Sequence, residues 1–148
     1  MERESAYTRW IFNKALNTKL EQLKETAEVT HSVYDKLIFS KIKEILGGRV
    51  RFFITGGAPI SQEVMDYIKV AFSAPMLQAY GITETCGFTC CSSVWETRAG
   101  VVGGPLPCLK MKLIDIPALG YLTTDSPPRG EVLVKGNSVF KGYFRNRE

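Results

Sequence analysis

Residues 50–80 alternate between strand-like and helix-like patterns, and this alternation restricts the possible folds more than any other feature. The run 50–55 (VRFFIT) is rich in β-branched and aromatic residues, and residues 75–80 form a second strand-like run. Between them, Ser61 is placed to cap a helix whose inward residues are expected to be Val64, Met65, Ile68 and Phe72. A strand–helix–strand unit usually places two parallel strands side by side through a right-handed crossover. The sequence therefore predicts an α/β layer.

Two further helices are predicted before this unit. Residues 6–27 show helical spacing of apolar residues, which puts Leu16, Leu20, Leu23 and Ala27 on one face. Ser32 is placed to cap a second helix with Asp35 as its capping-box partner, and Gly47 and Gly48 are expected to end it. Its apolar stripe is Tyr34, Leu37, Ile38, Ile42, Ile45 and Leu46. His31, just before the cap, is expected to be a solvated residue or a residue of the capping region.

The pattern changes after residue 100. KMKLID, GEVLVKG and VFKGYF are short strand-like runs separated by glycine and proline signals. We therefore predict one domain, residues 1–148, in which an α/β layer (1–100) is followed by an antiparallel, β-rich portion (101–148).

Charge and cysteine usage argue against several classes of protein. The 19 Lys and Arg and 15 Asp and Glu give a net charge of +4, but no segment concentrates it, so nucleic acid is not an expected partner. Cys86, Cys90, Cys91 and Cys108 lack C-x-x-C spacing and histidine partners, so we expect reduced thiols and no zinc. No apolar run approaches about 18 residues, and Met1 leads directly into charged residues, so neither a membrane span nor a signal peptide is expected.

Two loops are candidates for a ligand site. Gly56, Gly57 and Ala58 follow the first strand of the predicted unit, and GITET follows the second. Because the carboxyl ends of parallel strands meet at one sheet edge, where open α/β sheets bind ligands, we expect both loops there. The two glycines would let the backbone approach a ligand closely. Taken alone, this loop is equally consistent with an ordinary strand-to-helix turn.

The second loop carries more chemistry. Tyr80 is suited to stacking on an adenine ring, Gly81 to backbone access and Thr83 to a phosphate contact. The carboxylate of Glu84 is an oxygen ligand of the kind that Mg2+ prefers between protein and phosphates. A strand end with a glycine turn and a threonine cap remains the structural alternative. The chain contains neither the G-x-x-x-x-G-K-[ST] nor the G-x-G-x-x-G phosphate motif, and no G-x-S-x-G nucleophile motif.

Four sequence blocks occur together and in order, and they carry a resemblance. The blocks are GGAPIS, QAYGITET, GVVGGPLPCLKMKLID and RGEVLVKGNSVFKGYFRN. With them, the chain resembles the adenylate-forming (AMP-binding) superfamily. The segments YDKLIFSKIKEILGGRVRFFITGGAPIS and IPALGYLTTDSPPRGEV are similar to eukaryotic long-chain fatty acid CoA ligases in particular.

The resemblance implies a reaction and a set of roles. ATP and a fatty acid give an acyl-adenylate, which coenzyme A then converts to a thioester. By resemblance, Tyr80 stacks on adenine, Gly57 and Ala58 lie near the adenine and acyl groups, and Thr83 and Glu84 are catalytic. Thr83 contacts the α-phosphate and Glu84 ligates Mg2+. The family also implies peripheral contact with the cytosolic side of intracellular membranes, with the endoplasmic reticulum as the expected place.

Other blocks of the family do not occur in these 148 residues. They are its phosphate loop with a lysine, its T-G-D block with a ribose-binding aspartate, and its small C-terminal domain with a catalytic lysine. The chain is therefore expected to be a central part of the large N-terminal domain of a longer enzyme, and inactive alone. The alternative is a non-enzymatic truncated remnant that binds nucleotide or a partner without turnover.

Overall fold

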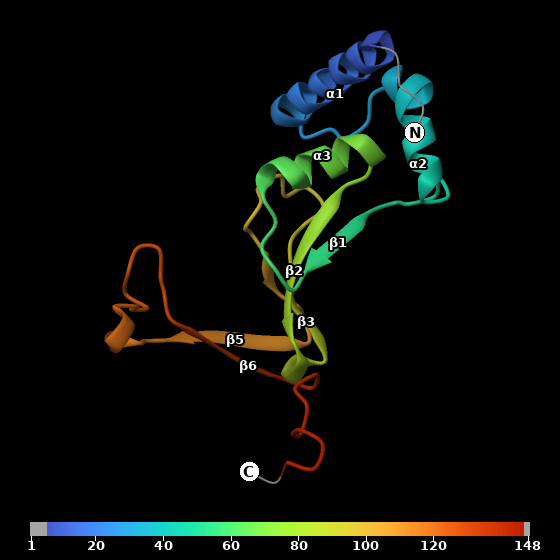
Figure 1. Ribbon diagram of the computed structural model, residues 1–148. Helices are drawn as coiled ribbons and strands as arrows, with labels where there is room; N and C mark the ends of the chain where they lie inside the picture. Colours follow the sequence, from blue (N-terminus) through green and yellow to red (C-terminus); the bar gives the residue numbers. More distant parts are fainter. Residues whose placement is uncertain (1–5, 147–148) are drawn as a thin grey trace. The chain divides into compact units, whose positions relative to one another are not determined.

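In the computed structural model, which describes residues 6–146, the chain divides into two compact units (Figure 1). The first contains the described residues up to Gln78 together with Ser92–Val101, and the second contains Ala79–Cys91 and the described residues from Val102 onward. These units differ from the predicted ranges 1–100 and 101–148, since residues 79–91 group with the later part of the chain. The sequence start that argued against a signal peptide lies outside the described residues.

The predicted α/β class is confirmed by a mixed sheet with the strand order β1-β2-β3-β4. In the first unit, β1 (Phe53–Gly56) and the start of β2 (Met76–Ile82) are joined by helix α3 (Gln62–Phe72), which is the predicted strand–helix–strand unit (Figure 1). Strand β1 is shorter than predicted, but Ser61 caps α3 as expected, because its hydroxyl accepts a hydrogen bond from the Val64 amide at 3.3 Å.

The predicted inward face of α3 needs one correction. Val64 is 49% exposed, whereas Met65 is fully buried. The buried residues are Met65, Asp66, Lys69, Val70 and Ala71. Helical geometry explains the shift, because residues 65 and 69 share one face and Val64 lies at its border. Hydrophobicity alone favoured the valine, while the apolar stem of Lys69 in fact takes the buried position.

Helix α1 (Ala6–Thr26) agrees closely with the predicted range 6–27. Its buried residues are Ala15, Lys19 and Leu23. The prediction that Leu23 faces inward is therefore confirmed, but the buried Lys19 was not predicted. Ala27 was placed on that face, but it is exposed and lies just beyond the helix with φ +60°.

The second helix begins differently from the prediction. It starts with a π-helical turn, η1 (Asp35–Phe39), and continues as α2 (Ser40–Ile45). Ser32 does not act as the predicted cap; instead, Nδ1 of His31 accepts hydrogen bonds from the Val33 and Tyr34 amides, each at 3.3 Å. His31 is thus a capping-region residue, as expected.

The predicted stripe on this helix is also partly wrong. Leu37 and Ile45 are 71% and 76% exposed, while Phe39 is fully buried. A π-helical turn adds a residue to the helical repeat, so it moves later side chains away from the positions that a 3.6-residue period predicts. The helix ends as predicted at Gly47 and Gly48, whose φ angles are +77° and +69°.

A buried lysine links the helices of the first unit. The Lys19 ammonium, 1% exposed, donates hydrogen bonds to Asp35 Oδ1 at 2.6 Å, to the Val70 carbonyl at 2.5 Å and to the Ser73 hydroxyl at 2.9 Å. It also lies 4.5 Å from the centroid of the Phe39 ring. Lys19 therefore joins α1 to η1 and to the C-terminal end of α3.

The second unit is built from antiparallel strands. The later residues of β2 pair with β3 (Gly87–Cys91), and β3 pairs with β4 (Gly104–Pro105). Strands β5 (Leu109–Ile114) and β6 (Glu131–Gly136) correspond to the strand-like runs KMKLID and GEVLVKG, and they pair with each other in the antiparallel sense. Short 3-10 turns are η2 (Thr83–Thr85) and η3 (Pro117–Leu119).

One expectation for this unit was wrong, and one strand was not predicted. VFKGYF is not a strand: the Phe140 amide donates to the Glu84 carbonyl at 2.9 Å instead of to a ladder partner, and Gly142 has φ +148°. Strand β3 was missed because it starts with a glycine and carries two cysteines, which give little strand signal.

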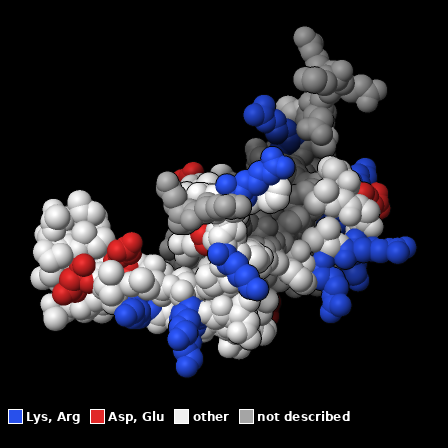
Figure 2. All heavy atoms as spheres, turned by 90° about the horizontal axis from the view of Figure 1, so that it is seen from below, with Lys and Arg blue, Asp and Glu red and all other residues white. Residues whose placement is uncertain are grey.

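The described residues show no helix with the length and apolarity needed to cross a membrane. All four cysteines are free thiols; Cys90 is buried, and Cys86 and Cys108 are exposed. Burial raises the pKa of the Cys90 thiol. On the face shown in Figure 2, Lys and Arg side chains lie at several separate places rather than in one patch.

Candidate functional site

The first candidate loop lies in the first unit, at the carboxyl end of β1. Gly56 is the last residue of that strand, and Gly57 follows with φ +85°, a conformation that favours glycine. Apart from Gly57 itself and its two chain neighbours, no residue has an atom within 4 Å of the position that a Cβ on Gly57 would take. Gly56, Gly57 and Ala58 are all exposed, so this loop offers backbone groups to a ligand.

Tyr80 and Gly81 lie within strand β2, not in a loop that follows it. Tyr80 is paired with Cys90 and Gly81 with Phe88, so Thr89 is an extra residue and the two strands form a β-bulge. A Cβ on Gly81 would lie 1.9 Å from the Gly87 carbonyl oxygen. Only glycine fits at this point. The close approach of the two strands therefore explains why position 81 is a glycine, in addition to the predicted access of a ligand to its backbone. Tyr80 is 37% exposed and keeps part of its ring open to a ligand.

Thr83 and Glu84 open the 3-10 turn η2 that connects β2 to β3, and the buried Thr85 anchors it. The Thr85 hydroxyl lies 3.0 Å from the Ile82 carbonyl oxygen and 2.8 Å from the hydroxyl of Thr89. Thr89 is fully buried, because the bulge turns its side chain toward the turn. This arrangement fixes the base of the turn and leaves Thr83 exposed on it.

The carboxylate of Glu84 is held by the segment after β6. The hydroxyl of Tyr143 donates a hydrogen bond to Glu84 Oε1, and the Phe140 amide donates to the Glu84 carbonyl at 2.9 Å. The hydrogen bond from Tyr143 lowers the pKa of the Glu84 carboxyl and raises the pKa of the Tyr143 phenol. Glu84 is therefore kept in the ionised form that a cation ligand requires.

The donor set around Glu84 decides which metal it suits. The described part of the chain contains no cluster of three or more His, Cys, Asp or Glu side chains that could enclose an ion. Mg2+ often binds through one or two carboxylates, with waters and substrate phosphates supplying the other oxygens. A lone ionised carboxylate next to the Thr83 hydroxyl thus fits a metal that arrives with a nucleotide, and does not fit a metal cage made of protein alone.

The predicted site residues fall into two groups, one in each unit. Tyr80, Gly81, Thr83 and Glu84 lie within the five residues 80–84 of one hairpin in the second unit, and Gly56, Gly57 and Ala58 lie in the first. That the two groups share one sheet edge stays a prediction. The residues that sequence reasoning missed are Thr85, Phe140 and Tyr143. The last two belong to the block VFKGYF, which was quoted for the resemblance and read as a strand.

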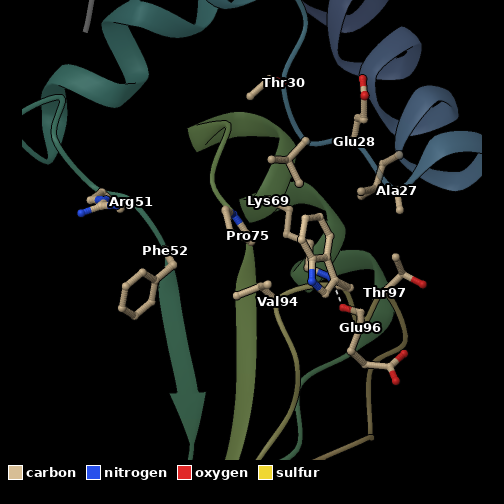
Figure 3. A pocket seen from close by; sticks show the side chains of 13 residues that line it. Ala27, Glu28, Thr30, Arg51, Phe52, Lys69, Pro75, Val94, Glu96 and Thr97 are labelled. Carbon is tan, nitrogen blue, oxygen red and sulfur yellow. Dashed lines mark hydrogen bonds between the residues drawn. The ribbon is translucent and has the colours of Figure 1, made fainter.

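A pocket of about 560 Å³ lies elsewhere in the first unit (Figure 3). Arg51 and Phe52, just before β1, and Pro75, just before β2, line it, so it lies at the opposite end of these strands from Gly57. The Lys69 ammonium in its wall donates to the Glu96 carbonyl at 3.2 Å, and burial lowers the pKa of Lys69. None of the predicted site residues lines this pocket.

Comparison with known proteins gives a consistent family match. The family described as "AMP-binding enzyme" matches residues 8–144. Fatty acyl-CoA synthetase A of Dictyostelium discoideum is 39% identical over 149 residues, covering 100% of this chain and 22% of that protein. Long chain acyl-CoA synthetase 7, peroxisomal, of Arabidopsis thaliana is 40% identical over 139 residues, covering 93% and 20%. This chain thus spans about a fifth of the length of these two relatives.

A solved structure supports the same match. The adenylation domain of a carboxylate reductase from Mycobacterium chelonae superimposes with a TM-score of 0.58 and 31% identity. The likeness covers 91% of this chain and 20% of the other. Sequence and fold therefore agree on one family.

Proposed function

Because the chain belongs to the AMP-binding enzyme family, we propose that it supplies nucleotide- and metal-binding residues of a long-chain fatty acid CoA ligase. The observation that carries this proposal is the turn η2, where an ionised Glu84 and the exposed Thr83 follow shortly after Tyr80, which is 37% exposed. An aromatic face, a hydroxyl and a carboxylate in this order suit the base, the phosphates and the metal of one nucleotide.

The proposed reaction has two steps. A carboxylate oxygen of the fatty acid attacks the α-phosphorus of ATP, which forms the acyl-adenylate and releases pyrophosphate. The thiolate of coenzyme A then attacks the carbonyl carbon of the adenylate, a C–S bond forms, and AMP leaves. Both steps move negative charge onto phosphate oxygens, so stabilisation of that charge is what the protein must provide.

Each candidate residue has a role in this proposal. Tyr80 stacks on the adenine, and the backbone at Gly81 lies beside it. The Thr83 hydroxyl donates to the α-phosphate, where charge increases as pyrophosphate leaves. Glu84 holds Mg2+, which when bound neutralises charge on the phosphates. Gly56, Gly57 and Ala58 provide a narrow wall near the adenine and the acyl group, which their exposed backbone supports.

The place where the protein works is a further part of the proposal. We expect peripheral attachment at the cytosolic side of an intracellular membrane, because long-chain fatty acids partition into bilayers. The Arabidopsis relative is named peroxisomal, and no finding favours the endoplasmic reticulum.

The proposed function can be tested in a chimera. The matching segment of the Dictyostelium synthetase is replaced by this chain, and ATP–pyrophosphate exchange with palmitate is measured with and without Glu84→Gln. We expect the variant to lower exchange by about 10²-fold, because a charge-stabilising group is lost from the transition state. Glu63→Gln, an exposed carboxylate in α3, is the matched control and should have no effect.

Two outcomes bear on the proposal directly. An active chimera whose exchange is unchanged by Glu84→Gln would remove this residue from the mechanism. The 148-residue chain assayed by itself is expected to form no palmitoyl-CoA, because it holds one side of the required pocket and such groups act together. Turnover above that of its Glu84→Gln variant would contradict this expectation.

A further inference from the structure

The segment that follows β6 contacts the turn η2 at two points. The Phe140 amide donates a hydrogen bond to the main-chain carbonyl oxygen of Glu84 at 2.9 Å. The Tyr143 hydroxyl donates a second hydrogen bond to the carboxylate of the same residue. The two aromatic rings also pack against each other, with centroids 4.9 Å apart and planes at 88°. Residues 140–143 thus form a compact piece of structure that binds one residue of the turn through both its backbone and its side chain.

A glutamate on an exposed turn is otherwise poorly placed to act as a ligand. Its side chain has three rotatable bonds, and ordering it costs up to about 2 kcal/mol of rotamer freedom at the moment when a ligand binds. A hydroxyl donor that already holds one carboxylate oxygen reduces that cost before binding. The donor is neutral, so it orients the carboxylate without cancelling its charge.

We propose that Phe140 and Tyr143 are positioning residues for Glu84: Phe140 fixes the turn, and Tyr143 holds one carboxylate oxygen so that the other is presented to the metal. This inference rests on the proposed function, in which Glu84 is the metal ligand. It implies that Glu84 binds the metal through a single oxygen. The near-octahedral geometry of Mg2+, with waters and phosphates at its other positions, is suited to that mode.

The chain itself offers the variants for a test. Tyr143→Phe removes only the hydroxyl and keeps the ring that packs on Phe140. Tyr121→Phe is the matched control, since Tyr121 lies in the same unit with its ring 5.3 Å from the Arg129 guanidinium. No hydrogen bond of its hydroxyl is found among the described residues. Glu84→Gln, alone and combined with Tyr143→Phe, completes a double-mutant cycle.

The measurement is metal binding on the 148-residue chain, with Mn2+ as a paramagnetic substitute and α,β-methylene-ATP as the nucleotide. Mn2+ broadens the NMR signals of nearby amides, so the broadening at residues 83–86 reports affinity and position together. We expect Tyr143→Phe to weaken binding about two- to tenfold, the range of one hydrogen bond. Hydrogen exchange at the Phe140 amide should stay as in the wild type, and Tyr143→Phe should add nothing once Glu84 is glutamine.

The possible results separate this inference from the proposed function. Equal Mn2+ affinity in Tyr143→Phe and Tyr121→Phe would overturn the positioning role, as would a full effect of Tyr143→Phe in the Glu84→Gln background. If Glu84→Gln binds Mn2+ as tightly as the wild type does, the metal role of Glu84 would instead be overturned. Absence of nucleotide-dependent broadening in the wild type would overturn the role given to Tyr143 in this chain; the proposed function would fall with it if Glu84→Gln also left pyrophosphate exchange unchanged in the chimera.

Discussion

Lys19→Met is expected to destabilise the first unit strongly, because it leaves a partly buried aspartate without its cation. The Lys19 side chain is 1% exposed and that of Asp35 is 15% exposed, and their charged atoms are 2.6 Å apart. The substitution also removes the donors to the Val70 carbonyl and the Ser73 hydroxyl. Removing one partner of a buried ion pair typically costs about 3–5 kcal/mol, and we expect a loss in this range.

The assay is urea unfolding followed by circular dichroism, with Lys24→Met as the control, since Lys24 is an exposed lysine of the same helix. The double variant Lys19→Met/Asp35→Leu should regain much of the lost stability, because two apolar side chains leave no unpaired charge. A loss below about 1 kcal/mol for Lys19→Met, the range of an exposed pair, would refute the reasoning.

The same pair predicts a pH dependence. Burial acts to raise the pKa of Asp35, but the Lys19 ammonium and the His31 amide outweigh it and leave that pKa below its ordinary value of 3.8. A lowered carboxyl pKa stabilises the fold above the unfolded value and is lost as the pH falls through the folded value. Stability should therefore decrease below about pH 4, and this acid-dependent part should shrink in Lys19→Met.

Two other predictions concern the hairpin and the location. Gly81→Ala should destabilise the second unit by about 1–3 kcal/mol, because its Cβ would lie 1.9 Å from the Gly87 oxygen, whereas Gly104→Ala, which meets no atom within 4 Å, should be tolerated in the same unfolding assay. Membranes from cells that express the chimera should release it in high salt if attachment is peripheral and electrostatic; retention that only detergent reverses would contradict this.

The parts of the fold that depend on local patterns could be predicted from the sequence. Apolar spacing located α1 and α3, Ser61 was identified as a cap, and Gly47 and Gly48 were identified as a helix end. These features follow from a few neighbouring residues, whose propensities act in the same direction.

The parts of the fold that depend on tertiary contacts could not be predicted from the sequence. Lys19 is buried only because Asp35, Val70 and Ser73 surround its ammonium, and they lie 16 or more residues away. A hydrophobicity pattern has no means of indicating a satisfied buried charge.

The site shows the same division. Tyr80, Thr83 and Glu84 could be selected from their chemistry and from one motif. Their setting could not, because the bulge at Thr89 and the hydrogen bond from Tyr143 to Glu84 join segments that are separate in the sequence. A tyrosine 59 positions away carries no sequence signal that it contacts a given carboxylate.

The unequal exposure of the four thiols provides a native attachment point for a reporter. Cys86 is exposed and follows Glu84 by two positions, while Cys90, on the next strand, is buried and its raised pKa slows alkylation. With the other exposed thiol removed by Cys108→Ser, a maleimide fluorophore would modify Cys86 preferentially. Such a label would lie beside the turn η2, so protection from alkylation or a change in emission on addition of nucleotide would test the binding proposed there.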